Sequence, residues 1–191
     1  MKSEKTDQRV KITKILLKKS LIELMSNNPI SKISVKMLCE SADINRSTFY
    51  AHYTDQYDLL KQLEQEVISE LEKHIAKEEF TKQTAQTVQV LNQILIYIAK
   101  NDAFFKVLLS ENGDSTLQRE IMRLAQQKTL AALQSDRRID PRTSEYLQCF
   151  VTTGALSIIQ KWLMEGMPES TETMSELASK LLYHGTSAFY F

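Results

Sequence analysis

The chain has 191 residues, 42% hydrophobic and 25% charged, so it can bury a substantial core as one domain or as a small domain plus a medium one. Lys and Arg total 24, as do Asp and Glu, and this net charge of zero by itself favours neither a nucleic-acid nor a membrane partner. No apolar run approaches the roughly 18 residues that span a bilayer, and the polar N-terminus lacks a signal-peptide core, so we predict a cytoplasmic protein without membrane contact.

The charges are unevenly distributed along the chain. Residues 1–54 hold ten Lys or Arg against five Asp or Glu, a net charge of +5, and the remainder carries −5. Such an imbalance arises by chance in short segments, but it is also typical of a basic nucleic-acid-binding head on an acidic body.

The first predicted helix spans residues 6–26. Its apolar residues trace one helical stripe, which we expect to face the core. They are Ile12, Ile15, Leu16, Leu21, Ile22 and Met25. The helix should end at Asn27-Asn28-Pro29, because asparagine accepts left-handed backbone angles and proline cannot continue a helix.

Residues 34–53, which read SVKMLCESADINRSTFYAHY, predict a helix-turn-helix. Two short helical patterns, at 35–41 and 46–52, flank a turn that is too short for antiparallel packing, so the two helices should cross steeply. Ser34 and Asn45 stand just before these helices, where their side chains can cap the first backbone amides.

The second helix of this motif combines an apolar face with a polar one. Ile44, Phe49 and Tyr53 form an apolar stripe, whereas the other positions carry hydrogen-bond donors and no carboxylate. A face of this kind suits a DNA groove. The candidate DNA-binding residues are Lys32, Ser34, Lys36, Asn45, Arg46, Ser47, Thr48, Tyr50, His52 and Tyr53.

These candidates divide by expected partner. Base edges and the adjoining backbone are expected for Arg46, Ser47, Thr48 and Tyr50, and phosphates for Tyr50, His52, Lys32 and Lys36. Each lysine taken alone is equally compatible with solvated surface, so the cluster carries the prediction.

The rest of the chain predicts helices and no strand. A long helix leaves the motif at Asp55, and within it we place a boundary between a DNA-binding domain, residues 1–64, and a second domain, residues 65–191. Such a helix can transmit a shift from one domain to the other. A turn at Asn112-Gly113-Asp114, Pro141 in a first turn and Ser170 or Thr171 as a cap separate the later helices. The fold class is therefore all-α, with about nine helices.

No pattern in the sequence indicates catalysis. Ser47 and His52 stand five apart on one short helix, where side chains do not meet. The three histidines lack metal-ligand spacing, and four scattered glycines form no phosphate loop. We interpret Cys39 and Cys149 as buried small hydrophobic residues, and we predict no catalytic residue, metal or cofactor.

Residues 45–53, NRSTFYAHY, followed by DQYDLL at 55–60, closely resemble the recognition helix and the start of the next helix in the tetracycline-repressor (TetR/AcrR) family. A weaker resemblance, to one Gram-positive branch of that family, covers residues 104–114 and 160–167. Two sites where the family usually has glycine hold Asn27-Asn28-Pro29 and Asp43. Asn and Asp tolerate left-handed backbone best among the other residues, so we expect the fold to be kept.

The resemblance implies a homodimeric transcription regulator that represses by occluding a promoter and is released when a small-molecule effector occupies the C-terminal domain. A dimer also has a physical advantage, because two recognition helices related by a twofold axis read half-sites of a palindromic duplex operator about 34 Å apart. Some relatives activate instead. Alternatives from other classes are a helical adaptor that binds protein and a small-molecule carrier whose ligand never alters DNA affinity.

Aromatic and sulfur-containing residues of the C-terminal region are candidates for the effector pocket, although each is more typical of ordinary core. They are Tyr97, Phe104, Phe105, Met122, Tyr146, Cys149, Phe150 and Trp162. No charged residue interrupts their helical stripes, which favours an apolar or neutral effector.

Small residues within a late helix predict a dimer interface, with packing inside the chain as the equal alternative. Thr153, Gly154 and Ser157 allow another helix to approach closely, at a site where glycine costs about 1 kcal/mol against alanine. The resemblance implies that the last two helices pair with their copies in a second chain. The candidate interface residues are Thr153, Gly154, Ser157, Met174, Leu177 and Leu181.

Overall fold

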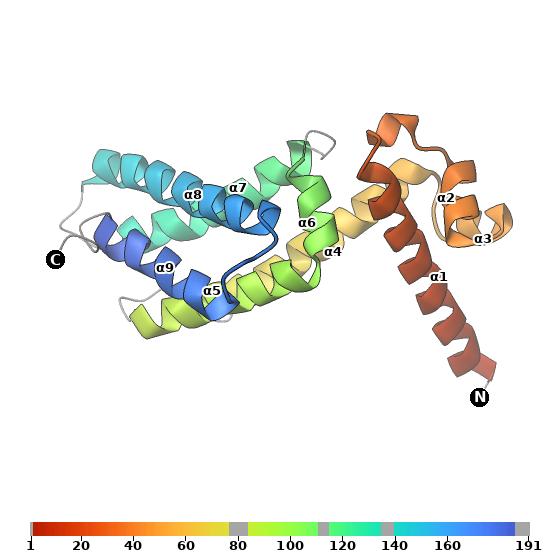
Figure 1. The fold of residues 1–191 in the computed structure, drawn as a ribbon, viewed down its shortest axis with the longest axis horizontal. Coiled ribbons are helices and arrows are strands. Elements are labelled where there is room, and N and C mark those ends of the chain that lie inside the picture. Colours follow the sequence, from red (N-terminus) through yellow and green to blue (C-terminus); the bar gives the residue numbers. More distant parts are fainter. Residues whose placement is uncertain (1, 77–83, 111–114, 135–139, 186–191) are drawn as a thin grey trace. The chain divides into compact units, whose positions relative to one another are not determined.

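The computed structural model describes residues 2–76, 84–110, 115–134 and 140–185, and in these ranges it has nine α-helices and no strand (Figure 1). The helices are α1 (Lys2–Met25), α2 (Val35–Ala42), α3 (Arg46–Tyr50), α4 (Gln56–Ala76), α5 (Thr84–Lys100), α6 (Asp102–Leu108), α7 (Ser115–Gln134), α8 (Pro141–Met164) and α9 (Thr171–His184), with a 3-10 turn η1 (Ile30–Lys32) before α2. The predicted all-α fold is confirmed. The predicted turn at Asn112-Gly113-Asp114 lies outside the described residues. Within the described ranges, no helix has the length and apolar character needed to cross a membrane.

The chain divides into two compact units. The first comprises Met1–Val67 with Val107–Asp114, and the second comprises Ile68–Lys106 with Ser115–Phe191. The division therefore falls within α4 and within α6, so that each of these helices contributes to both units.

The core of the first unit is built from α1, α2, α3 and the N-terminal part of α4. Leu17 and Leu21 on α1, Leu38 on α2, Phe49 on α3 and Leu59 on α4 are all fully buried. α1 packs against α2, and α2 packs against α3. This shared core holds the two short helices in place, because neither is long enough to be stable alone in water.

The predicted core face of α1 is partly wrong. Leu21 and Met25 are buried as predicted, but Ile12, Ile15 and Leu16 are exposed, and Leu17, which was not in the predicted stripe, is buried next to Leu21 in the core. At about 100° per residue the three exposed residues lie on the side of the helix opposite Leu17 and Leu21. α1 thus carries apolar residues on both sides, and the periodicity alone does not tell which side meets the core.

A side-chain cap at its start and a left-handed residue at its end explain where α2 begins and ends. The Ser34 hydroxyl oxygen accepts a hydrogen bond from the Met37 backbone N–H at 3.3 Å, which confirms Ser34 as the predicted cap. α2 ends at Asp43, whose φ of 53° is left-handed. Aspartate therefore takes the conformation for which glycine is the usual choice.

The end of α1 differs from the prediction. Neither Asn27 nor Asn28 has a positive φ. Instead, the Asn28 side-chain amide donates to the Leu24 carbonyl oxygen at 3.1 Å, which satisfies one of the last helical carbonyls. Asparagine therefore ends this helix through its side chain and not through a left-handed backbone.

The start of α4 is fixed by a reciprocal cap. The Asp55 carboxylate accepts from the Asp58 backbone N–H at 2.8 Å, and the Asp58 carboxylate accepts from the Thr54 backbone N–H at 2.9 Å. The bond from Thr54 holds the pKa of Asp58 below its usual value. α4 therefore begins a fixed, short distance after α3.

The second unit contains α5, α7, α8, α9 and parts of α4 and α6. α5 packs against α9, α7 against α8, and α8 against α9. Pro141 occupies the first turn of α8 and Ser170 caps α9, as predicted, and Asp140 caps α8, which was not predicted. Trp162 is buried and its indole N–H donates to the Glu169 carbonyl oxygen at 3.0 Å, which ties α8 to the segment that leads into α9.

Candidate nucleic-acid interface

α3 presents most of its polar side chains to solvent and is held by one aromatic ring. Arg46 and Ser47 are exposed and Tyr50 is 58% exposed, whereas Phe49 is fully buried. The Phe49 ring lies edge-on to Tyr50 at 5.5 Å between ring centroids and is 5.6 Å from the ring of Tyr53. The buried Phe49 ring thus holds α3 against the core, while the hydrogen-bond donors of the helix face solvent.

Asn45 occupies the cap position of α3 without capping it. Its backbone is extended, with φ −65° and ψ 142°, as expected just before a helix, but its side chain makes no capping hydrogen bond. The prediction of a side-chain cap at Asn45 is therefore wrong. Its amide is exposed, so it can bind a partner outside the chain.

The structure places most of the predicted DNA-binding residues on the surface of the first unit. The exposed ones are Lys32, Ser34, Lys36, Asn45, Arg46, Ser47 and Tyr50. Thr48 and His52 are half-buried. These positions come from η1, α2, α3 and the residues beside them, so that the helix-turn-helix brings together side chains from several short segments.

Tyr53 does not fit the predicted interface. Its side chain is 2% exposed and its hydroxyl is buried without a hydrogen-bond partner among the described residues. Burial, with smaller contributions from Glu66 and Asp58, raises the pKa of Tyr53 to about 12. Tyr53 therefore supports the motif from the core and is not a DNA contact.

This burial predicts how stability depends on pH. In the unfolded chain a tyrosine titrates near 10. Because burial favours the neutral phenol, its contribution is complete below about pH 10 and is lost as the pH rises through about 12. The loss amounts to at most about 2–3 kcal/mol. Tyr53→Phe should be at least as stable as the wild type at pH 8, because it removes a buried hydroxyl without a partner, and its advantage in free energy of unfolding should grow by pH 11.5, as measured by urea denaturation. Tyr57→Phe, which removes an exposed hydroxyl, is the control and should follow the wild type at both pH values.

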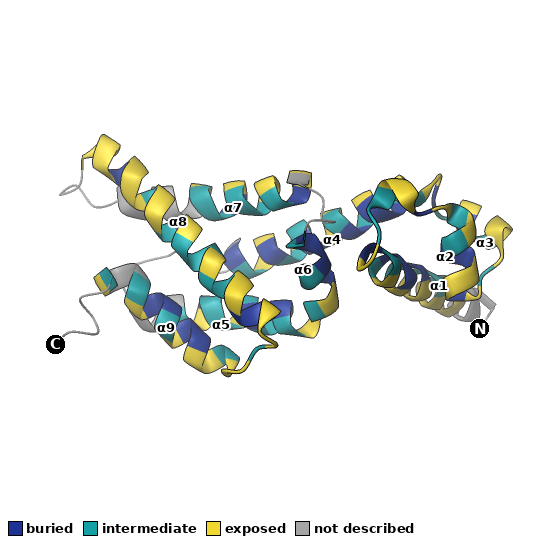
Figure 2. Cartoon of the chain, turned by 45° about the horizontal axis from the view of Figure 1, so that its top comes forward, coloured by how far each residue is buried: buried dark blue, intermediate teal, exposed yellow. Residues whose placement is uncertain are grey.

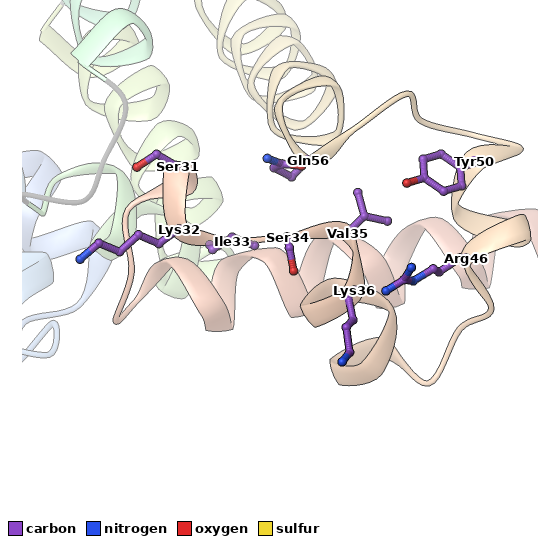
Figure 3. Close-up of a pocket in the computed structure, with 9 residues that line it drawn as sticks. All are labelled: Ser31, Lys32, Ile33, Ser34, Val35, Lys36, Arg46, Tyr50 and Gln56. Atoms are coloured by element: carbon purple, nitrogen blue, oxygen red, sulfur yellow. The ribbon is translucent and has the colours of Figure 1, made fainter.

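A concavity of about 430 Å³ opens beside α3, among η1, the start of α2 and the start of α4 (Figure 3). It is lined by Ser31, Lys32, Ile33, Ser34, Val35, Lys36, Arg46, Tyr50 and Gln56. Three of these nine side chains are cationic, the other six offer hydroxyl or amide groups or apolar surface, and none is Asp or Glu. We call this site the basic concavity.

One acidic residue lies next to the basic concavity. The Glu40 carboxylate is 3.7 Å from the ammonium group of Lys36, one turn away on α2, and both side chains are exposed. An exposed pair of this kind contributes little to stability. It does, however, offset one of the positive charges that would attract an anion.

Removing that carboxylate should strengthen duplex binding. For Glu40→Gln we expect a roughly two- to fivefold higher affinity at low salt, and a smaller gain at high salt because the interaction is screened. Fluorescence anisotropy with a labelled duplex measures this. The matched control is Glu23→Gln, which breaks the equivalent exposed pair between Lys19 and Glu23 on α1, 3.8 Å apart and away from the concavity. An equal gain from both variants would mean that only net charge matters.

Two polar residues of the concavity were not among the residues predicted from the sequence. Ser31 lies in η1 and Gln56 is the first residue of α4. Gln56 could have been identified from the sequence. A helix was predicted to start only a few residues after the motif, and the first residue of such a helix stays close to α2 and α3. Nothing in the sequence marked Ser31, since η1 was not predicted.

The predicted effector-pocket residues fall into two groups. Tyr97, Phe104, Phe105, Met122 and Trp162 are buried or half-buried within the second unit. Tyr146, Cys149 and Phe150 are instead exposed on α8, so their assignment to a pocket inside the chain is wrong, as is the prediction of a buried Cys149. Their apolar stripe faces out of their own chain.

An aromatic cluster joins three helices of the second unit. The Tyr97 ring on α5 lies 5.8 Å from the His74 ring on α4 and 5.9 Å from the Phe105 ring on α6. The Nδ1 atom of His74 is buried and has no hydrogen-bond partner among the described residues. His74 was not singled out from the sequence, because a lone histidine in an amphipathic helix carries no signal.

α8 carries a long exposed strip, which Figure 2 shows along much of the helix. It contains Thr153 and Ser157, flanked by the exposed side chains of Phe150 and Met164. A Cβ atom built on Gly154 would have no neighbour within 4 Å. The strip therefore combines large apolar residues with a small, open centre.

On α9 the predicted interface is only partly available to another chain. Leu177 and Leu181 are half-buried, whereas Met174 is buried inside its own chain. The assignment of Met174 to a dimer interface is therefore wrong. Met174 is part of the core of the second unit, in which α9 packs against α5.

Among the described residues, no group of three or more His, Cys, Asp or Glu side chains is arranged to hold a metal ion.

A model of a TetR C-terminal family, described as a transcriptional regulator C-terminal region, matches residues 85–184, which is 100 of the 191 residues. No protein with a curated description matches the chain.

Several solved structures share the fold over nearly the whole chain. The fatty acid degradation regulator FadR from Bacillus halodurans is 12% identical, with a TM-score of 0.67 over 91% of this chain and 95% of that one. A TetR transcriptional regulator from Streptococcus agalactiae is 20% identical, with a TM-score of 0.62 over 94% and 98%. NalD from Pseudomonas aeruginosa, the secondary repressor of the MexAB-OprM multidrug efflux pump, is 14% identical, with a TM-score of 0.64 over 95% and 97%. Identities this low show the fold alone.

Proposed function

The chain belongs to the TetR family of transcriptional regulators, and from this premise we propose that it is a homodimer that binds a palindromic duplex operator and represses transcription until a small-molecule effector releases it. The observation that carries the proposal is the outward face of α3, whose exposed donors adjoin a concavity lined by three cations and no carboxylate. Double-stranded DNA supplies the acceptors and negative charge that such a face can bind. We place the protein in the cytoplasm, where its DNA target is.

We assign DNA binding to residues 1–64 and effector binding with dimerisation to residues 65–191. The division into compact units within α4, at Val67, supports this assignment. α4 belongs to both units as one continuous helix, so a change in the second unit can reach the first through it.

Dimerisation is proposed along the exposed strip of α8. Phe150 and Met164 lie in this strip as large apolar side chains in contact with water, which costs free energy that a second copy would recover. The small residues Thr153, Gly154 and Ser157 between them leave room for a close helix approach. Leu177 and Leu181 on α9 are the proposed neighbours of this strip in the same interface.

The effector is proposed to bind in the second unit among Tyr97, Phe104, Phe105, Met122 and Trp162. The ring contacts of Tyr97 with His74 and Phe105 support a site lined mainly by aromatic and apolar groups. Such a lining suits an apolar or neutral molecule. The unpaired Nδ1 of His74 provides one polar position there, because a buried nitrogen without a partner costs free energy that a ligand hydroxyl can recover.

Control by an effector requires a preference between two states of the protein. The effector must bind the form that cannot bind DNA more tightly than the form that can, and a tenfold preference corresponds to about 1.4 kcal/mol. Derepression follows from this linkage when the effector is present. If the protein activates transcription, the same linkage operates with the opposite effect on the promoter.

An electrophoretic mobility-shift assay with the DNA upstream of the protein's own coding region tests the proposal. We expect a shift that resists competitor DNA and that is reversed by apolar or neutral candidate effectors. A reporter gene behind this promoter, measured with and without the protein, distinguishes a repressor from an activator. Absence of any shift at low salt would instead support the adaptor, and ligand uptake without a change in DNA affinity would support the carrier.

A further inference from the structure

The residues of α3 and the turn after it point in different directions. At about 100° per residue, Ser47 and Ala51 each lie about 160° from the buried Phe49, so they point away from the core. Arg46 and Tyr50 lie only about 60° and 100° from Phe49, on the flank of the helix. All four of these residues are exposed and Phe49 is fully buried, so Phe49 marks the side of the helix that faces the core.

The flank that carries Arg46 and Tyr50 borders the basic concavity. Both residues line it, whereas Ser47 and Ala51 do not. Figure 3 shows the Arg46 guanidinium and the Tyr50 hydroxyl directed toward the start of α2, where Val35 and Lys36 lie. A side chain that points back along the protein surface is poorly placed to reach base edges in front of the helix.

The charges around the concavity indicate what it binds. Lys32, Lys36 and Arg46 bring three positive charges to one site of about 430 Å³, and among the residues that the structure describes only Lys36 of these three pairs with a carboxylate, that of Glu40 at 3.7 Å. Ser31, Ser34 and Gln56 add hydrogen-bond donors from three different segments. A tetrahedral anion with several acceptor oxygens satisfies donors that converge in this way.

We propose that the basic concavity holds one backbone phosphate of the DNA duplex, that Arg46 and Tyr50 bind this phosphate, and that Ser47 and Ala51 read base edges. The proposal rests on the proposed DNA binding and narrows the role expected for Arg46, which the sequence placed at base edges and the adjoining backbone, to the backbone alone. A serine hydroxyl can bond to either a donor or an acceptor on a base, and the alanine methyl can contact the methyl group of thymine. Arg46 then contributes affinity and register without sequence preference.

The first test selects duplexes from a random-sequence pool with the wild-type chain and with Arg46→Ala. A phosphate contact predicts that both select the same sequence, that Arg46→Ala binds it roughly tenfold or more weakly, and that the slope of log affinity against log salt falls by about 1 for each half-site. Lys36→Ala is the matched control for a phosphate contact and should behave alike. Ser47→Ala should lose the preference at one position of each half-site while keeping the salt slope.

The second test locates the phosphate. In the duplex that the wild type selects, single phosphates are replaced one at a time by neutral methylphosphonates. One position in each half-site should weaken the wild type and have little further effect on Arg46→Ala, because both changes remove the same contact. Thermal melting of Arg46→Ala and of Lys36→Ala should match that of the wild type, since both altered side chains are exposed.

The outcomes distinguish a failure of the phosphate assignment from a failure of DNA recognition. If Arg46→Ala selects a sequence that is relaxed at one base position and keeps the wild-type response to every methylphosphonate, Arg46 reads a base and the proposal is wrong. If the wild type enriches no sequence, DNA recognition itself fails. Selection by the wild type together with failure of the methylphosphonate test overturns only the assignment of the concavity.

Discussion

Replacing Phe49 with alanine should lower the free energy of unfolding of the first unit by about 3–5 kcal/mol, the usual cost of removing a fully buried phenyl ring. Phe49 is the main anchor of a helix of only five residues, and its ring contacts those of Tyr50 and Tyr53. The variant should therefore also lose sequence-specific DNA binding. Chemical denaturation followed by circular dichroism measures the first effect, and fluorescence anisotropy measures the second.

Tyr50→Ala is the matched control for this prediction, because it removes a ring of similar size from the adjacent position on the same helix. Tyr50 is 58% exposed, so its loss should change stability by less than about 1 kcal/mol. It should still weaken DNA binding. Equal stability losses for the two variants would contradict the packing that places Phe49 inside and Tyr50 outside.

Replacing Phe150 with aspartate should convert the dimer into a monomer. Phe150 is 68% exposed in the single chain, and in the proposed interface an aspartate there would bury a charge without a partner, which costs several kcal/mol. Light scattering after gel filtration should give twice the chain mass of 22.0 kDa for the wild type and the single-chain mass for the variant. Affinity for a palindromic operator should fall by two orders of magnitude or more, because the two recognition helices are no longer linked.

Ile15→Asp provides the control for the loss of an exposed apolar side chain. Ile15 is exposed on α1 in the first unit, outside the proposed interface. This variant should remain a dimer. A wild type that is monomeric at micromolar concentration, or a Phe150→Asp variant that stays dimeric, would remove α8 as the interface.

Much of the helix-turn-helix could be predicted from the sequence because its signals are local. Ser34 caps α2 and Asp43 takes the left-handed turn within a few residues of the segments they define. Asn45 marks the right position but makes no capping bond, which a sequence pattern does not reveal. Tyr53 was assigned both to the apolar stripe and to the DNA contacts, and its burial supports only the first.

The errors share one physical cause, since helical periodicity shows that a face is apolar but not what covers it. On α1 the apolar residues occur on both sides, and Leu17 lies in the core beside Leu21, whereas Ile12 and Ile15 are exposed. On α8 the aromatic stripe that includes Phe150 is exposed and not part of an internal pocket. For α8 we propose a second chain as the missing cover, which a single sequence does not specify.

The basic concavity could not be predicted because it depends on tertiary structure. Ser31 in η1, Arg46 in α3 and Gln56 in α4 are separated along the chain and meet only when the first unit has folded. The sequence did predict a cluster of cations near the motif. The flank of α3 on which Arg46 lies becomes clear only when the burial of Phe49 fixes the rotation of the helix.

The central claim is that two copies of α3 bind one duplex in successive turns of the major groove. Hydroxyl-radical footprinting of the wild type on the DNA upstream of its own coding region tests this most directly. The account predicts two protected patches whose centres are about 10 base pairs apart, or a whole multiple of that spacing, and the loss of both with Phe150→Asp. A single patch, or protection by the wild type that Phe150→Asp leaves unchanged, would contradict it.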